Sequence, residues 1–161
     1  MYDLVIVGGG AAGLTAALYA SRSGLDCIVL DPSSPEGSSI ALTDAVENYT
    51  GFSDIAGFDL IQHFYSHAKL FGADFVRQAL VGIRKNYDGF TLECSDSEVK
   101  TKSVILCMGA THKKLGIDGE NKFEGRGVSY CAVCDGYFFK DKTVAGISGG
   151  KTPPTGGTNP F

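Results

Sequence analysis

The fold is decided near the N-terminus by the stretch Leu4-Val5-Ile6-Val7-Gly8-Gly9-Gly10-Ala11-Ala12-Gly13. Its first four residues form a short apolar run that ends in glycines, which predicts a parallel strand buried on both faces. The spacing Gly8-x-Gly10-x-x-Gly13 is typical of a dinucleotide-binding turn. We expect Gly8 to make the tight turn, Gly10 to let a pyrophosphate approach the backbone, and Gly13 to let a helix pack on the strand. The unpaired N–H groups at the start of that helix would attract an anion.

The context that this motif requires follows directly in the sequence. Residues 14–20 are helix formers, and Gly24 is a suitable C-terminal cap. Residues 27–30 form a second apolar run that ends at Asp31, whose carboxylate is placed to accept hydrogen bonds from a ribose. The alternative is a glycine turn in an unrelated α/β protein, and the complete context argues against it.

Length and composition exclude several classes of protein. The 161 residues suffice for one domain, or for one domain and part of another. The net charge of −4 argues against a general nucleic-acid or anionic-membrane surface. We find no apolar run of the roughly 20 residues that a membrane helix needs, and no signal peptide. We therefore expect a cytoplasmic protein with no nucleic-acid or membrane partner.

The remaining patterns alternate between strands and helices. Residues 59–71 predict an amphipathic helix closed by Gly72, and residues 75–83 read as a strand. Residues 89–94 and 98–102 alternate as the two strands of a hairpin, and residues 103–110 predict a further buried strand ending in a glycine. The expected fold is α/β: a Rossmann-like parallel sheet with helices and a small antiparallel meander, in three layers.

Some candidate side chains have an ordinary structural explanation. His63 and His67 are four residues apart on the expected helix, but with no third ligand nearby a solvated face is the better interpretation. Asn48 lies in a loop among aromatic residues, where it either bonds a polar ring edge or makes a local turn. The cysteines within strand patterns have modest chemical interest; they are Cys27, Cys94 and Cys107.

A close cysteine pair gives the second chemical signal, in Ser129-Tyr130-Cys131-Ala132-Val133-Cys134-Asp135-Gly136. Such a pair can close a small disulfide ring in which one thiol acts as nucleophile. Asp135 follows at once and can relay a proton to the leaving thiolate. The rival is half of a zinc site, but the chain has no second pair of this spacing and His112 stands alone. A nucleotide site and a redox dithiol together indicate a flavin that takes electrons from a nicotinamide and passes them to the disulfide.

The sequence closely resembles the bacterial-type, low-molecular-weight thioredoxin reductases. The resemblance covers about residues 2–147, and its matching pieces run in the family's order: Gly8–Ala17, Val46–Tyr49, Leu106–Ala110 and Phe123–Gly136. It implies an enzyme that passes electrons from NADPH through FAD to the Cys131–Cys134 disulfide and on to thioredoxin, and that works as a homodimer. Cys134 would face the flavin, Cys131 would attack or release the thioredoxin disulfide, and Asp135 would be the acid.

The resemblance also implies a set of FAD contacts. Asp31 would lie near the adenosine ribose, Asn48 near the isoalloxazine, and the backbone at Ala79 and Leu80 against the adenine. The other implied contacts are Gly8, Gly9, Gly10, Ala11, Ala12, Gly13, Ser38, Ser39, Ile40, Met108, Gly109 and Ala110. Two departures matter: Ser38 and Ser39 replace a usual glycine and flavin-contacting glutamine, and Cys107-Met108-Gly109 replaces Ala-Thr-Gly.

The C-terminal segment departs further. Residues 143–147 resemble the strand that opens the NADPH domain, but Pro153 and Pro154 follow where a helix is expected. We expect an FAD-binding domain over 1–115, the start of the NADPH and redox-disulfide domain over 116–147, and an irregular or foreign tail over 148–161. The sequence thus indicates a truncated, frame-shifted or engineered chain. The alternatives are a non-catalytic FAD-binding fragment and a relative fed by ferredoxin.

Overall fold

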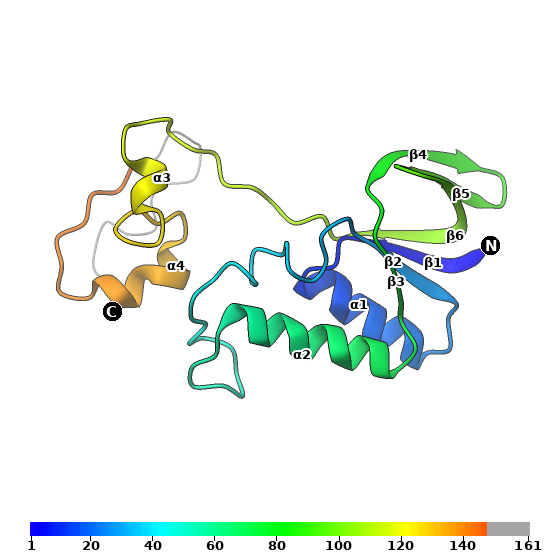
Figure 1. Ribbon diagram of the computed structural model, residues 1–161, viewed down its shortest axis with the longest axis horizontal. Coiled ribbons are helices and arrows are strands. Elements are labelled where there is room, and N and C mark those ends of the chain that lie inside the picture. The colour runs from blue at the N-terminus through cyan, green and yellow to red at the C-terminus, as the bar shows by residue number, and fades with distance from the viewer. Residues whose placement is uncertain (148–161) are drawn as a thin grey trace. The chain divides into compact units, whose positions relative to one another are not determined.

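A mixed sheet organises the first of two units in the computed structural model, which describes residues 1–147. This unit spans Met1–Ala110, and its six strands lie in the order β3-β2-β1-β6-β5-β4 (Figure 1). The strands are β1 (Tyr2–Val7), β2 (Cys27–Leu30), β3 (Asp74–Val76), β4 (Leu80–Asn86), β5 (Gly89–Cys94) and β6 (Glu98–Leu106). The helices are α1 (Ala11–Arg22) and α2 (Gly57–Leu70).

Strands β1 and β2 are buried on both faces, as their apolar runs predict. On one face Leu4 and Ile6 pack with Ala17 of α1 and Ala68 of α2. On the other face Val5, Val7, Ile28 and Leu30 pack against Leu92 of the antiparallel meander β4-β5-β6. The unit therefore has three layers, with helices, parallel strands and meander in turn (Figure 1). The expected α/β fold is confirmed.

The prediction of a single strand over residues 75–83 is wrong. The chain forms two strands there, broken at residues 77–79, and they lie at opposite edges of the sheet. β3 pairs parallel with β2, whereas β4 pairs antiparallel with β5. An apolar run shows where strands can form, but the pairing partners decide where one strand ends.

Strand β6 also differs from the expectation, because residues 98–102 and 103–106 form one continuous strand. Its first half pairs antiparallel with β5, and most of its length pairs parallel with β1. The second half is not buried as expected: Ile105 is 40% exposed and Leu106 is 54% exposed. β5 pairs with β6 only up to Thr101, so among the described strands residues 103–106 pair with β1 alone.

The second unit begins at Thr111 and, through residue 147, contains only short helices. They are α3 (Glu120–Phe123), α4 (Ala132–Asp135) and the 3₁₀ helix η1 (Gly136–Phe139). The prediction of a strand over residues 143–147 is also wrong, because these residues pair with no strand in the described part of the chain. The expected tail, 148–161, lies outside the described residues. None of the helices within residues 1–147 has the length and apolar character needed to cross a bilayer.

Candidate functional site

The turn between β1 and α1 is packed so tightly that two of its positions admit no side chain. Gly8 has a φ of 104°, which favours glycine, and a Cβ there would overlap the carbonyl oxygen of Cys107. A Cβ on Gly13 would overlap the carbonyl oxygen of Gly8. The predicted turn at Gly8 and the close packing at Gly13 are therefore confirmed. Their contacts with a cofactor stay predictions.

The first turn of α1 has the properties of an anion site. Around Gly10 there is room, since the atom nearest to a Cβ built there is the Ser38 Cβ, at 3.9 Å. No side chain caps the helix N-terminus, and the first turn, which begins at Ala11 and Ala12, contains no acidic residue. The N–H groups of this turn thus have no side-chain cap, and together with the positive end of the helix dipole they can attract an anion. The space at Gly10 and the uncapped first turn of α1 are therefore suited to a pyrophosphate.

Asp31, at the end of β2, binds the glycine turn. One of its carboxylate oxygens accepts the Gly9 N–H at 2.6 Å, and the other accepts the Ser33 N–H at 2.8 Å and the Ser33 hydroxyl at 3.2 Å. The buried Ser34 closes the same region by donating to the Gly9 carbonyl at 3.2 Å. Asp31 therefore positions the turn in addition to its predicted role toward a ribose. No sequence pattern indicated this role of Ser34.

The loop after β2 contributes one predicted residue directly beside the turn. Ser38 is half-buried next to Gly10, and its hydroxyl accepts the Ala41 N–H at 3.2 Å. Ser39 is exposed, and the carbonyl of Ile40 lies against Gly57 at the start of α2. Asn48 is exposed in the following loop. The structure thus brings Ser38 to the glycine turn and leaves Ser39 and Asn48 open to solvent.

Two further predicted segments begin at the same edge of the sheet. The Val76 carbonyl accepts the Asp31 N–H at 3.1 Å, so the residues that lead to Ala79 and Leu80 leave β3 beside Asp31. The Cys107 N–H donates to the Val7 carbonyl at 2.7 Å, which fixes the end of β6 beside Gly8. The exposed residues Met108, Gly109 and Ala110 follow from that point.

In the second unit, Cys131 and Cys134 are joined in a disulfide, with their Cα atoms 5.2 Å apart. Cys131 caps the N-terminus of α4, and its sulfur accepts the Cys134 N–H at 3.1 Å. Cys134 is exposed and Cys131 is half-buried. A hydrogen bond from a backbone N–H stabilises negative charge on a sulfur, so this arrangement supports Cys131 as the nucleophilic thiolate once the disulfide is reduced.

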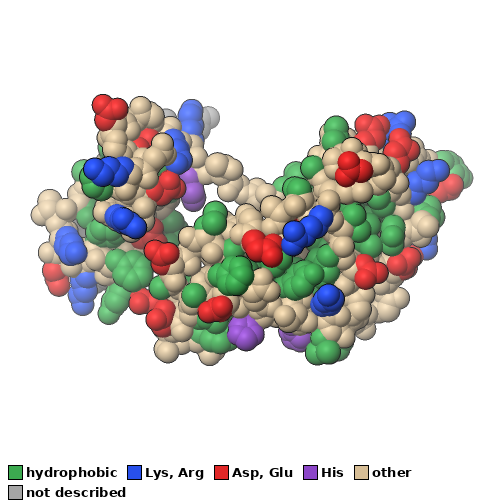
Figure 2. Space-filling view, viewed as in Figure 1, with side chains coloured by type: hydrophobic (Ala, Val, Ile, Leu, Met, Phe, Trp, Pro, Cys, Tyr) green, Lys and Arg blue, Asp and Glu red, His purple; other side chains and the backbone are tan. Residues whose placement is uncertain are grey.

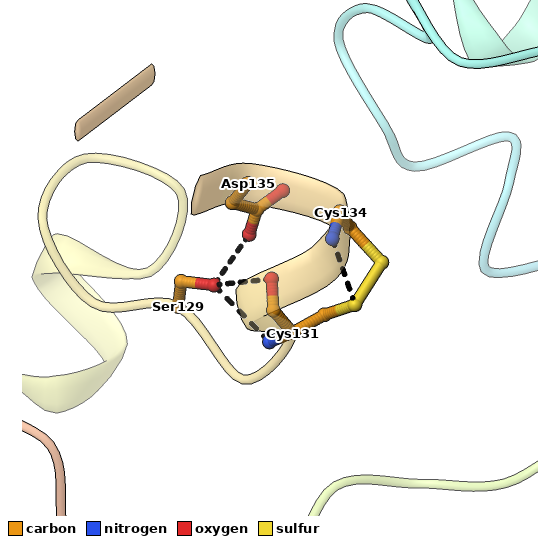
Figure 3. The surroundings of a disulfide bond; sticks show 4 residues. All are labelled: Ser129, Cys131, Cys134 and Asp135. Carbon is orange, nitrogen blue, oxygen red and sulfur yellow. Dashed lines mark hydrogen bonds between the residues drawn. A yellow bond between two sulfur atoms is a disulfide. The ribbon is translucent and has the colours of Figure 1, made fainter. Parts of the chain in front are cut away.

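Asp135 is held by a residue that sequence reasoning missed. The Ser129 hydroxyl donates to the Asp135 carboxylate at 2.6 Å and accepts the Cys131 N–H at 3.1 Å. The carboxylate is turned toward Ser129, and the sulfurs lie on the other side of the turn (Figure 3). The signal that could have found Ser129 is its position, because a serine two residues before a helix N-cap is placed to bond local backbone groups.

Glu120 is the second residue that sequence reasoning missed, and it is only 4% exposed. Its carboxylate accepts the N–H groups of Leu115 at 2.8 Å and Gly116 at 2.7 Å, and the Tyr130 hydroxyl at 2.7 Å. These bonds hold the pKa of Glu120 below its usual value, chiefly through the Leu115 N–H and then the Tyr130 hydroxyl. The same carboxylate raises the pKa of Tyr130 to about 12. Tyr130 directly precedes Cys131, so Glu120 anchors the disulfide loop.

The other histidines and cysteines have structural environments. His63 stacks on Phe52 with ring centroids 5.9 Å apart, and His67 packs on Phe71 at 5.6 Å. Histidine side chains are visible at the surface along α2 (Figure 2). Within residues 1–147, no group of three or more His, Cys, Asp or Glu side chains could hold a metal ion. Burial raises the pKa of the Cys94 and Cys107 thiols, which disfavours their thiolates, and Cys27 is buried.

The model of the pyridine nucleotide-disulphide oxidoreductase family matches residues 2–152. The chain belongs to this family. It is 41% identical over 150 residues to a thioredoxin reductase of Bacillus subtilis, a match that covers 93% of this chain and 47% of the relative. A thioredoxin reductase of Treponema pallidum is 44% identical over 150 residues, covering 92% of this chain and 48% of the relative.

A solved structure of a thioredoxin reductase is also similar to this chain. The crystal structure of thioredoxin reductase from Streptococcus pyogenes aligns with a TM-score of 0.82 and 39% identity, covering 88% of this chain and 46% of that one. The chain is thus a homologue of the bacterial, low-molecular-weight thioredoxin reductases, and it spans about half the length of the curated relatives it matches. The family uses FAD and NAD(P)H.

Proposed function

We propose that the protein acts as a thioredoxin-reductase-type flavoprotein that passes electrons from NADPH through FAD to the Cys131–Cys134 disulfide and on to thioredoxin. The observation that carries this proposal is the closed Cys131–Cys134 disulfide in a chain of this family. Bound FAD would supply two-electron transfer between a nicotinamide and the disulfide. The complete protein would work as a homodimer.

The residues of the glycine turn would bind the FAD. Gly10 leaves space for the pyrophosphate, and the uncapped N-terminus of α1 offers it N–H groups and a positive dipole. Asp31 would orient the turn through Gly9 and accept a ribose hydroxyl with its remaining lone pairs. The loop and strand-end residues would line the cofactor: Ser38, Ser39, Ile40, Asn48, Ala79, Leu80, Met108, Gly109 and Ala110.

The second unit would carry out the disulfide exchange. Cys131 would attack the disulfide of the partner protein, because the Cys134 N–H stabilises charge on its sulfur. Cys134 would be the sulfur that exchanges electrons with the flavin, and Asp135 would give a proton to a leaving thiolate. We assign residues 1–115 to the FAD-binding domain and residues 116–147 to the start of the NADPH and redox-disulfide domain. The break between the two compact units, at residue 110, supports a boundary nearby.

The proposal is tested with the FAD-loaded chain under anaerobic conditions. We expect dithiothreitol to reduce the disulfide and then to bleach the flavin absorbance near 450 nm, and we expect Cys134→Ser to bleach much more slowly. Equal bleaching of the two proteins would contradict electron transfer through this disulfide.

A second reductant separates the complete electron path from a partial one. Bleaching of the same sample by NADPH would support the full enzyme activity in this chain. Bleaching by dithiothreitol without bleaching by NADPH would support a flavin–disulfide path whose electrons come from elsewhere, for example from ferredoxin. A chain that retains no FAD after gel filtration would be a non-catalytic fragment.

A further inference from the structure

Ser129 touches both ends of the short helix that carries the disulfide. Its hydroxyl oxygen accepts the Cys131 N–H at 3.1 Å and donates to the Asp135 carboxylate at 2.6 Å. The Cys131 carbonyl, at 3.3 Å, is a second acceptor for the same hydroxyl. Figure 3 shows the three contacts converging on this one side chain.

The hydroxyl has one proton and two acceptors within reach, so it can satisfy only one of them at a time. A carboxylate is the stronger acceptor, and its distance is shorter by 0.7 Å, the difference between 3.3 and 2.6 Å. In the oxidised protein the proton therefore lies toward Asp135. When Asp135 takes up a proton it becomes the weaker acceptor, and the hydroxyl can turn to the Cys131 carbonyl instead.

We propose that Ser129 is a positioning residue that holds the Asp135 carboxylate in the oxidised protein and releases Asp135 once it is protonated. This inference rests on the proposed function, since Asp135 has a part only if the disulfide is exchanged. The observation behind it is the direction of the carboxylate, which points to Ser129 and not to the sulfurs (Figure 3). Asp135 must leave Ser129 before it can reach a leaving sulfur.

The step balances as an ordinary thiol–disulfide exchange. A dithiol reagent attacks one protein sulfur as a thiolate, the S–S bond breaks, and the other protein sulfur leaves as a thiolate. A proton moves from Asp135 to that leaving sulfur, and the carboxylate returns to Ser129. The second thiol of the reagent then displaces the protein sulfur, so the reagent ends as a cyclic disulfide and the protein holds two thiols. The two protons of the reagent replace those taken up by the protein.

The experiment measures how fast dithiothreitol reduces the disulfide of the full 161-residue chain. Samples are quenched with an alkylating reagent in denaturant, and mass spectrometry counts the two new alkyl groups. We expect Ser129→Ala to be reduced about three- to fivefold faster than the wild type, the size expected for losing one solvent-exposed hydrogen bond. Asp135→Asn, which keeps an acceptor for Ser129 but cannot give a proton, should be slower by about tenfold.

Three further variants separate positioning from simple loosening of the loop. Ser129→Thr keeps the hydroxyl and should stay within about twofold of the wild type. In the Asp135→Asn background, Ser129→Ala should have no further effect, because Ser129 acts through Asp135. Ser95→Ala is the matched control: Ser95 donates to the Asp96 carboxylate at 3.2 Å in the other unit, and its removal should leave the rate unchanged.

Each outcome decides the inference. An unchanged or slower Ser129→Ala rate overturns it, and so does an equal acceleration in the Asp135→Asn background, which would mean that the loop has merely loosened. A wild-type disulfide that neither opens with dithiothreitol nor re-forms with its oxidised form would overturn the proposed function, and this inference with it.

Discussion

Each of the two units of the chain is stabilised by a different kind of interaction. The first buries a continuous set of aliphatic side chains on both faces of β1 and β2. In the second, over residues 111–147, the one buried side chain is the carboxylate of Glu120. Apolar burial is non-directional and tolerates small shifts, whereas a buried carboxylate is stable only with its donors in place. The glycine turn thus follows a strand buried in an apolar core, and the disulfide lies on a loop held mainly by hydrogen bonds.

The largest effect is expected where the first unit is packed most tightly. Gly13→Val should destabilise it by about 3 kcal/mol or more, because the new side chain would overlap the Gly8 carbonyl. Urea unfolding followed by circular dichroism measures this. Gly10→Ala, at a position with room, is the control and should cost less than about 1 kcal/mol. Equal midpoints for the two variants would contradict the packing described for the turn.

The next effect tests whether the two units are independent. Leu92→Ala should destabilise the first unit by about 2–4 kcal/mol, because Leu92 is fully buried against the parallel strands. At urea concentrations that keep the first unit folded, the rate of disulfide reduction should match the wild type. Val81→Ala, at a residue 72% exposed, is the matched control and should change stability little. A change in the disulfide rate for Leu92→Ala alone would show that the units share their stability.

A smaller effect is expected in the second unit from Glu120→Gln. The amide puts a donor where the carboxylate accepts the N–H groups of Leu115 and Gly116. Amide hydrogen exchange at these residues should speed up, while exchange in β1 should not change. Glu124→Gln, which removes only an exposed ion pair with Lys114, is the control. Unchanged exchange at residues 115–116 would contradict a stabilising role of the Glu120 carboxylate in this unit.

The pH dependence of the second unit follows from the same carboxylate. The pKa of Glu120 is lowered in the folded chain, first by the Leu115 N–H, so the carboxylate contributes stability above its ordinary pKa of 4.5. That contribution is lost as the pH falls through the lowered value. The protection factors at residues 115–117, which correct for the intrinsic pH dependence of exchange, should therefore fall in acid in the wild type. The Glu120→Gln variant should lack this fall.

The smallest effect is spectroscopic. Tyr130 should ionise with a pKa of about 12 because its hydroxyl donates to Glu120. Its hydrogen bond contributes stability below the ordinary pKa of 10 and loses it as the pH rises through 12. Absorbance at 295 nm after a rapid pH jump, with Tyr130→Phe subtracted, isolates this group. In Glu120→Gln the midpoint should move back toward 10, and an unmoved midpoint would contradict the assignment.

The same difference between the units explains what could be predicted from the sequence. The first unit was predictable where periodicity and glycine spacing reflect burial, as in β1, α1 and β2. Prediction failed at 75–83 and at residues 103–106, because the partner of a strand depends on contacts distant in sequence. In the second unit the cysteine pair was visible as a motif. Ser129 and Glu120 were not, because a hydrogen-bonded loop has no periodic pattern.

The most direct test of the central claim is a titration of the purified chain with FAD, followed by the quenching of flavin fluorescence, for the wild type and for Gly10→Val. A Cβ at position 10 comes no closer than 3.9 Å to another protein atom, so a valine there would extend into the space left for the pyrophosphate. We predict that the wild type binds one FAD per chain, and that Gly10→Val unfolds at a similar urea concentration but binds none. Retained FAD binding in this variant, or no binding by the wild type, would contradict a flavin site at the turn between β1 and α1.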